Sequence, residues 1–175
     1  MELPLAVMIT IPEPWANNDT ISQAKRDFYQ YYATMMEPWD GPASILFSDG
    51  DVMGAVLDRN GLRPSRYYIT SDGYMILSSE VGVLPIPEEK IVLKERLHPG
   101  KMLLVDTVKG KVIDDNELKE GYAKMQPYGE WLDSHLVQLK DIKIPNERPE
   151  EYTPEQRARL QLSLIHISEP TRHAQ

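Results

Sequence analysis

The stretch that decides the fold is residues 44–70, SILFSDGDVMGAVLDRNGLRPSRYYIT. Apolar segments at 44–47 and 52–57 flank Ser48-Asp49-Gly50-Asp51, and Asp-Gly supplies the positive φ angles that a tight hairpin turn needs. A second turn signal, Asp58-Arg59-Asn60-Gly61, ends the second segment. The spacing therefore predicts two antiparallel strands joined by a hairpin and followed directly by another tight turn.

The same pattern of short apolar segments and tight turns continues further along the chain. A turn at Ser71-Asp72-Gly73 and a turn at Val108-Lys109-Gly110 each join two such segments. The additional predicted strands are 66–70, 74–78, 102–106 and 111–113. Five or six strands joined by tight turns predict an antiparallel sheet, because parallel strands need long crossover connections.

The segments before the strands are expected to differ from one another. Residues 1–19 are rich in Pro and Asn, and Pro12 and Pro14 predict that no regular helix forms there. Residues 20–36 place apolar side chains at helical spacing and are predicted to form an amphipathic helix that ends before Pro38.

Helices are also predicted after the strands. Residues 115–125 and 128–140 read as two helices that Pro127 separates. The charged, Pro-rich residues 141–154 suit a linker, and another helical pattern begins at 155–161. Helices flanking an antiparallel sheet make the predicted fold class α+β.

Composition and charge exclude several classes of function. The 175 residues contain no cysteine, which removes disulfides, Cys-ligated zinc, iron–sulfur ligation and thiol catalysis within this chain. A net charge of −8 argues against a non-specific nucleic-acid binder. No apolar run is long enough to span a bilayer, and the N-terminus lacks the basic region of a secretory signal. We therefore expect a soluble cytoplasmic domain with neither a nucleic-acid nor a membrane partner.

The common catalytic patterns are missing from the sequence. His98 and His135 have no second His at metal-ligand spacing, so solvated or structural roles are expected. Asp133, Ser134 and His135 make no triad, because neighbours on a helix point in different directions. The glycines are dispersed at turns and form no phosphate loop. No catalytic, cofactor-binding or metal-binding residue is assigned.

The most unusual local feature is the loop after the second strand, which holds three arginines within eight residues. The forked guanidinium group of arginine binds carboxylates and carbonyls bidentately. These arginines therefore either buttress the turn or line a site for an anionic group such as a substrate carboxylate. Composition alone leaves these two roles open. The residues singled out near this site are Asp58, Arg59, Asn60, Gly61, Arg63 and Pro64.

Six short motifs lie in or around this loop: MEPWDGPA at 36–43, LDRNGLRPSRY at 57–67, SEVGV at 79–83, PGKM at 99–102, IPEPWANN at 11–18 and PYGEW at 127–131. Through them the sequence resembles the large subunit of glutamate synthase over residues 5–161, in the order and spacing of that family. The Gly-Leu-Arg-Pro turn alone indicates only the broader class-II glutamine amidotransferases. The motifs EPWDGPA and PYGEW narrow the resemblance to glutamate synthase.

The resemblance implies a fold and an activity. The fold is that of N-terminal-nucleophile hydrolases, two stacked antiparallel sheets with helices on the outer faces, of which this chain carries part. The family hydrolyses glutamine to glutamate and ammonia, which is reductively transferred to 2-oxoglutarate in nitrogen assimilation and glutamate biosynthesis. The full-length family uses FMN, an iron–sulfur cluster and NAD(P)H or ferredoxin. The implied partners are glutamine and the remaining domains of the large subunit, and a small electron-donating subunit is left open.

The catalytic residues of the family have no counterpart here. The family's nucleophile is an N-terminal Cys, whereas this sequence begins with Met1 and contains no Cys. The oxyanion-hole word Asn-Gly-Glu-Ile-Asn is absent as well. We therefore expect residues 1–140 to be the C-terminal part of the amidotransferase domain, 141–161 to be a linker and the start of the central domain, and the chain alone to be inactive. Asp58 to Pro64 is expected to brace the nucleophile-bearing sheet.

The last residues resemble something other than protein-coding sequence. The string LSLIHISEPTR at 162–172 is similar to a translated sequencing adaptor, and residues 162–175 are expected to be an adaptor-derived tail that cuts the helical pattern at Gln161.

Two other functions remain open from the sequence. One is a fragment of another class-II amidotransferase, similar to amidophosphoribosyltransferase. The other is a non-catalytic binding module, although half of a two-sheet sandwich would leave a sheet face and strand edges uncovered.

Overall fold

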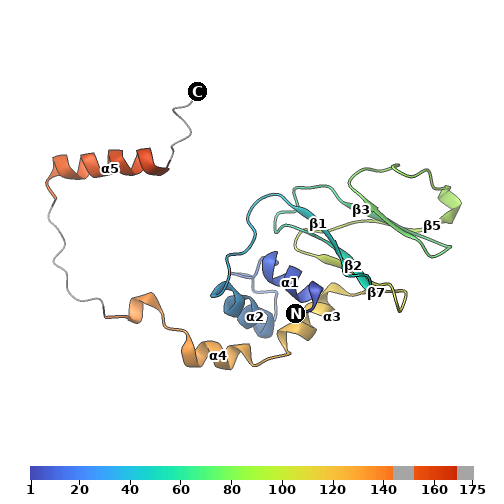
Figure 1. Cartoon of the computed structure of the whole chain (residues 1–175), viewed down its shortest axis with the longest axis horizontal. Helices are drawn as coiled ribbons and strands as arrows, with labels where there is room; N and C mark the ends of the chain where they lie inside the picture. The colour runs from blue at the N-terminus through green and yellow to red at the C-terminus, as the bar shows by residue number, and fades with distance from the viewer. Residues whose placement is uncertain (144–151, 169–175) are drawn as a thin grey trace. The chain divides into compact units, whose positions relative to one another are not determined.

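The computed structural model describes residues 1–143 and 152–168, with side chains given up to Gln161. The chain divides into two units, Met1–Leu136 and Val137–Gln175 (Figure 1). Each helix in the described part of the chain is too short or too polar to cross a membrane.

The first unit contains a four-stranded antiparallel sheet in the order β1-β2-β6-β7. It confirms both hairpins predicted for this part of the chain. Gly54 in the second strand lies under the ring of Phe47, whose Cζ would be only 2.5 Å from an added Cβ. The strands are β1 (Ser44–Ser48), β2 (Val52–Leu57), β6 (Met102–Asp106) and β7 (Lys111–Ile113).

A second, three-stranded sheet has the order β4-β3-β5 and is also antiparallel. Its third strand was not predicted, so the described chain has seven strands instead of five or six. That strand is an edge strand with five of its six residues exposed, so its sequence carries no alternating apolar pattern. The strands are β3 (Arg66–Thr70), β4 (Met75–Ser78) and β5 (Ile91–Arg96), with a short 3-10 turn η1 (Glu88–Lys90) before the last.

The two faces of the four-stranded sheet pack against different parts of the first unit. On one face Val56 and Met102 join the core formed with the helices, which gather on that side (Figure 1). On the other face Ala55, Leu57 and Leu103 pack against the three-stranded sheet. The alternation of these residues along β2 and β6 places neighbouring side chains on opposite faces. The predicted α+β class and the stacking of two antiparallel sheets are therefore confirmed.

The N-terminal helix was not expected. Helix α1 (Leu3–Thr10) forms within residues 1–19, where Pro12 and Pro14 led us to predict no regular helix. Both prolines lie beyond its end, and Pro4 falls in its first turn, where a missing N–H costs nothing. The helix buries Val7 and Met8 in the core.

Three more helices complete the first unit, and all three are shorter than predicted. Helix α2 (Gln23–Ala33) begins after Ser22, whose side chain accepts a hydrogen bond from the Lys25 N–H. Helix α3 (Asp115–Ala123) is capped in the same way by Asp114. Helix α4 (Tyr128–His135) ends well before residue 140. Aromatic side chains of α2 and α4 pack on one another: Phe28, Tyr31, Tyr32, Tyr128 and Trp131.

The second unit contains a 3-10 turn η2 (Leu139–Asp141) and helix α5 (Pro154–Ser168). Thr153 and Gln156 exchange hydrogen bonds in a capping box at the start of α5. The backbone helix continues past Gln161, where we expected the pattern to stop. The predicted linker lies largely outside the described residues, as does the end of the predicted adaptor-derived tail, and both stay predictions.

Candidate functional site

The loop after β2 is organised by one buried carboxylate. Asp58 is only 3% exposed. Its side chain accepts hydrogen bonds from the backbone N–H groups of Ala43 (3.0 Å), Asn60 (2.9 Å) and Gly61 (3.2 Å). Burial raises the pKa of this carboxyl, but these backbone donors, together with that of Leu62, outweigh burial and hold the pKa below its ordinary value. Asp58 therefore stays ionised and ties the loop to the segment before β1.

Close packing seats this loop on a second turn. Gly61 has a φ of 60°, and a Cβ added to it would lie 2.5 Å from Cγ of Pro99. Gly100 has a φ of 64° and lies against Pro14. Both positions therefore require glycine for conformation and for space. The Gly100 N–H also donates to the Asp58 carbonyl at 3.3 Å.

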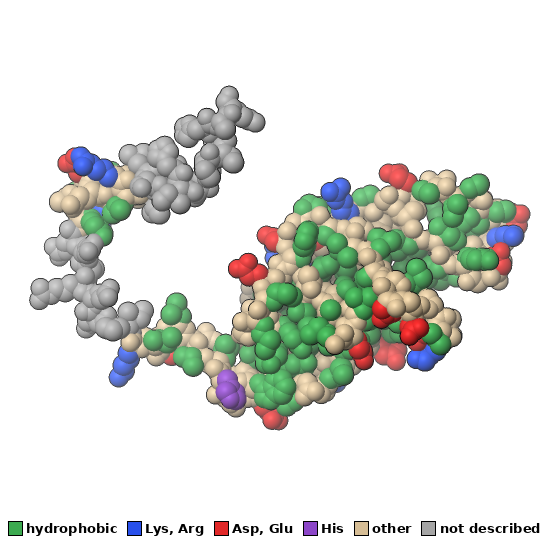
Figure 2. All heavy atoms as spheres, viewed as in Figure 1, with side chains coloured by type: hydrophobic (Ala, Val, Ile, Leu, Met, Phe, Trp, Pro, Cys, Tyr) green, Lys and Arg blue, Asp and Glu red, His purple; other side chains and the backbone are tan. Residues whose placement is uncertain are grey.

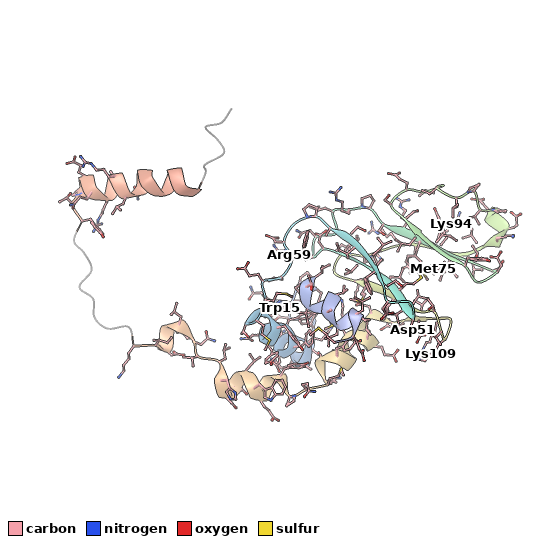
Figure 3. All side chains as sticks on the ribbon, in the orientation of Figure 1. Trp15, Asp51, Arg59, Met75, Lys94 and Lys109 are labelled. Carbon is pink, nitrogen blue, oxygen red and sulfur yellow. The ribbon has the colours of Figure 1, made fainter. Side chains whose placement is uncertain are left out.

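The side chains of Arg59 and Arg63 are exposed and share no carboxylate partner among the described residues. Arg59 pairs with Asp40 across 3.0 Å, and both side chains are well exposed. In Figure 3, Arg59 and Asp51 lie at opposite ends of the β1–β2 hairpin. Arg63 and Pro64 are exposed, and within the described residues Arg63 makes no ion pair. The six singled-out residues therefore share one loop but form no enclosed site.

A buried ionic network lies behind this loop, and the sequence reasoning missed it. Glu13 is 8% exposed. One of its carboxylate oxygens forms an ion pair with Lys25 at 3.1 Å, and the other forms one with Lys119 at 3.4 Å. Lys119 also contacts Asp115 at 2.7 Å. The hydroxyl of Tyr29 donates to Glu13 at 3.3 Å. Two cations thus face two carboxylates inside the unit, which limits the cost of burying each charge.

A sequence signal for this network existed. Lys25 lies three residues before Phe28 and four before Tyr29, and Lys119 has the same spacing to Tyr122 and Ala123. Residues at these spacings share one face of a helix. A lysine on the apolar face of a helix is a candidate for a buried, paired cation. Its partners could not be read from the sequence, because Glu13 lies 106 residues before Lys119.

The network is connected to the loop. Lys119 donates to the Gly100 carbonyl at 2.7 Å, and Gly100 in turn contacts Asp58. Burial raises the pKa of Asp115, but Lys119 and further donors outweigh this and lower it. Burial raises the pKa of the Tyr29 hydroxyl, and the nearby Glu13 charge raises it further, so this hydroxyl remains protonated. The arrangement is a charged brace between helices and loops.

The described residues carry no evident nucleophile. Ser65 is 4% exposed and its hydroxyl has no hydrogen-bond partner among them, so no base activates it. His98 is half exposed near Glu95, and His135 contacts the Trp131 carbonyl on its own helix. No group of potential metal ligands occurs among the described residues.

An apolar groove opens between the two sheets, with a volume of about 700 Å³. Its walls include the exposed side chains of Leu46 (63%), Met53 (52%) and Val112 (41%). These residues lie on the sheet face that the three-stranded sheet covers only in part. Figure 2 shows hydrophobic side chains exposed over this part of the molecule. A groove with no charged lining offers packing surface rather than acid–base chemistry.

The stacked antiparallel sheets and the braced Gly-Leu-Arg-Pro loop agree with the result of sequence comparison. The family of class-II glutamine amidotransferases matches residues 1–131, and the chain belongs to this family.

Curated proteins similar to this chain include several glutamate synthases. The chain is 52% identical over 144 residues to the NADPH glutamate synthase large chain of Bacillus subtilis, a match that covers 82% of this chain and 9% of the relative. It is 52% identical over 142 residues to the NADH glutamate synthase of Schizosaccharomyces pombe, covering 81% and 7%. The ferredoxin-dependent glutamate synthase of rice is 49% identical over 142 residues, covering 79% and 9%. The chain thus spans less than a tenth of the length of these relatives.

Proposed function

We propose that this chain is part of the glutamine amidotransferase domain of a glutamate synthase large chain. The observation that carries the proposal is about 50% identity to glutamate synthases over some four fifths of the chain. In the proposed protein, glutamine is hydrolysed to glutamate and ammonia, and the ammonia is reductively transferred to 2-oxoglutarate. A cytoplasmic location belongs to the same proposal.

Within that domain, this chain supplies scaffold and not the reacting groups. Acyl transfer needs an activated nucleophile and preorganised oxyanion donors. The family's nucleophile is a cysteine, and this chain has none. We expect the purified chain to release no ammonia from glutamine. The loop from Asp58 to Pro64, fixed by backbone donors and the Glu13–Lys119 network, is proposed to brace the sheet that bears the nucleophile.

The groove supports the proposal that residues 1–140 are the C-terminal part of a larger domain, and residues 141–161 are proposed separately to be a linker and the start of the central domain. Leu46 and Met53 expose most of their apolar surface on the same sheet face that buries Ala55, Leu57 and Leu103. Apolar sheet faces of this kind are normally covered, because exposed ones favour aggregation. Further residues of the amidotransferase domain are proposed to cover it.

The redox groups of glutamate synthases do not fit this chain. An iron–sulfur cluster needs cysteine thiolates, which the sequence lacks. No phosphate-cradling loop for FMN or a nicotinamide cofactor is present in the sequence either. Electron transfer is therefore proposed to occur on other domains, and the relatives differ in whether NADPH, NADH or ferredoxin is named as donor.

A chimera tests the proposal directly. The matching 144 residues of the Bacillus subtilis large chain are replaced with those of this chain. If the proposal holds, the chimera produces glutamate from glutamine and 2-oxoglutarate. Supplying an ammonium salt in place of glutamine is the control, because it bypasses glutamine hydrolysis.

Two results are informative. Glutamine-dependent synthesis close to that of the parent supports the proposal. A chimera that uses ammonium normally but not glutamine contradicts it, because the folded remainder is then intact and only the replaced segment fails.

A further inference from the structure

Three arginines stand out by lacking the ion pairs that other cations of the first unit possess. In residues 1–136, every Lys and Arg pairs with a described carboxylate except Arg63, Arg66, Arg96 and Lys111. Lys111 belongs to the other sheet. The three arginines, which we call the arginine surface, are all exposed.

Strand register brings two of them together. Arg66 of β3 is the direct cross-strand partner of Arg96 of β5. Directly opposed like charges in an antiparallel pair lie about 5 Å apart at Cβ and destabilise the pair. The neighbouring carboxylate gives no relief, because Glu95 points to the opposite face, where it accepts from Tyr67 at 2.8 Å.

The third arginine, Arg63, is exposed and lies three residues before Arg66, in the loop that precedes β3. Ser65 accepts a hydrogen bond from the Leu97 N–H through its carbonyl, so the chain just before Arg66 lies against the chain just after Arg96. Arg63 is two residues before Ser65, on the loop that Asp58 fixes. Two directly paired arginines, with a third three residues away in sequence, thus lie exposed on a chain whose net charge is −8.

We propose that the arginine surface is a docking site for a carboxylate-bearing, acidic segment of a partner protein. Arginine forks bind carboxylates bidentately, and a sequence that retains opposed like charges at a cost in stability points to use of those charges in binding. A partner carboxylate between Arg66 and Arg96 neutralises the repulsion between their charges. Binding therefore also removes the cost of placing these two arginines opposite each other. A nucleic-acid partner fits less well, because three cations on an acidic chain neutralise few phosphates.

Binding of fluorescent octaglutamate to the full 175-residue chain tests the inference by fluorescence anisotropy, and it needs no glutaminase activity. We expect octaglutamate to bind at low salt and to weaken as salt screens the charges. The triple variant Arg63→Gln, Arg66→Gln, Arg96→Gln is expected to weaken binding by about tenfold or more. Removing the repulsion leaves this variant folded, which far-ultraviolet circular dichroism checks.

The matched control is Lys90→Gln, Lys109→Gln, Lys124→Gln, which removes the same charge from exposed lysines that are already ion-paired. It is expected to bind octaglutamate within about twofold of the unmodified chain. Equal weakening by both triple variants overturns the proposal, because attraction is then due to overall charge. No binding of octaglutamate, or tighter binding of a single-stranded oligonucleotide of equal charge, overturns it as well.

Discussion

At the scale of single residues, Asp58 shows how a polar loop acquires a fixed shape. Its ionised carboxylate accepts hydrogen bonds from one backbone N–H group before β1 and from two after β2, at distances of 2.9–3.2 Å. Charge-assisted bonds of this kind are stronger than neutral ones and leave no buried donor unpaired. The arginines of the same loop contribute little to that shape, because Arg59 forms an exposed pair and Arg63 faces solvent.

Gly61 gives the sharpest prediction at this scale. Gly61→Ala is expected to lower the free energy of unfolding by about 3 kcal/mol, because a Cβ costs about 1–2 kcal/mol at positive φ and also strikes Pro99. Gly110→Ala is the matched control, with a φ of 62° and open space around its Cβ. Urea unfolding measures both. Equal losses for the two variants would show that the contact with Pro99 carries no energy.

At the scale of elements, the ionic network fastens α2 and α3 to the segment that follows α1. Lys25 comes from α2, Lys119 and Asp115 from α3, and Glu13 from the connecting segment. Asp115 also accepts from the Met102 N–H at 2.8 Å, which ties α3 to the start of β6. Because buried charges depend on their partners, loss of one member is expected to unsettle the others.

The pKa of Asp115 makes this brace sensitive to acid. A carboxyl whose pKa is lower in the folded chain than its ordinary value of about 4 adds stability above that value, and the stability is lost as pH falls through the folded pKa. Asp115→Asn is expected to cost about 2–3 kcal/mol at pH 7 and to make stability less dependent on pH below about 4.

Urea unfolding midpoints measured from neutral to acidic pH check this expectation. Asp133→Asn is the control, because Asp133 is exposed on α4 and makes no ion pair among the described residues. A variant of Asp115 that keeps the full acid dependence would refute the assignment of that dependence to this carboxyl.

At the scale of the whole molecule, the groove between the sheets offers a test of the proposal that residues 1–140 belong to a larger domain. Met53→Lys is expected to change the stability of the 175-residue chain by less than about 0.5 kcal/mol, because Met53 is 52% exposed. In the glutamate synthase chimera the same substitution is expected to abolish glutamine-dependent synthesis, because the proposed cover then buries an unpaired charge.

Val108→Lys is the matched control for this substitution, since Val108 is 75% exposed in the turn before β7 and lies outside the groove. It is expected to leave the chain and the chimera unchanged. A chimera that tolerates Met53→Lys as well as Val108→Lys would show that the groove stays open in the larger protein.

Much of the fold could be predicted from local sequence. The Asp-Gly turns predicted the β1–β2 hairpin, and the apolar spacing of residues 20–36 predicted a helix close to the one that forms. Strand β5 was missed, because an exposed edge strand needs no alternation of apolar residues. Helix α1 was missed, because Pro12 and Pro14 follow its end and do not interrupt it.

The sequence by itself determined the α+β class and the lack of any cysteine in this chain, because turn chemistry, periodicity and composition are local properties. Its likeness to known sequences determined the membership in the class-II glutamine amidotransferases. Only the tertiary structure decided that Glu13, Lys25, Asp115 and Lys119 share one buried network and that Arg66 faces Arg96. Those pairings depend on strand register and helix packing, which join residues far apart in the chain through contacts that no short segment encodes.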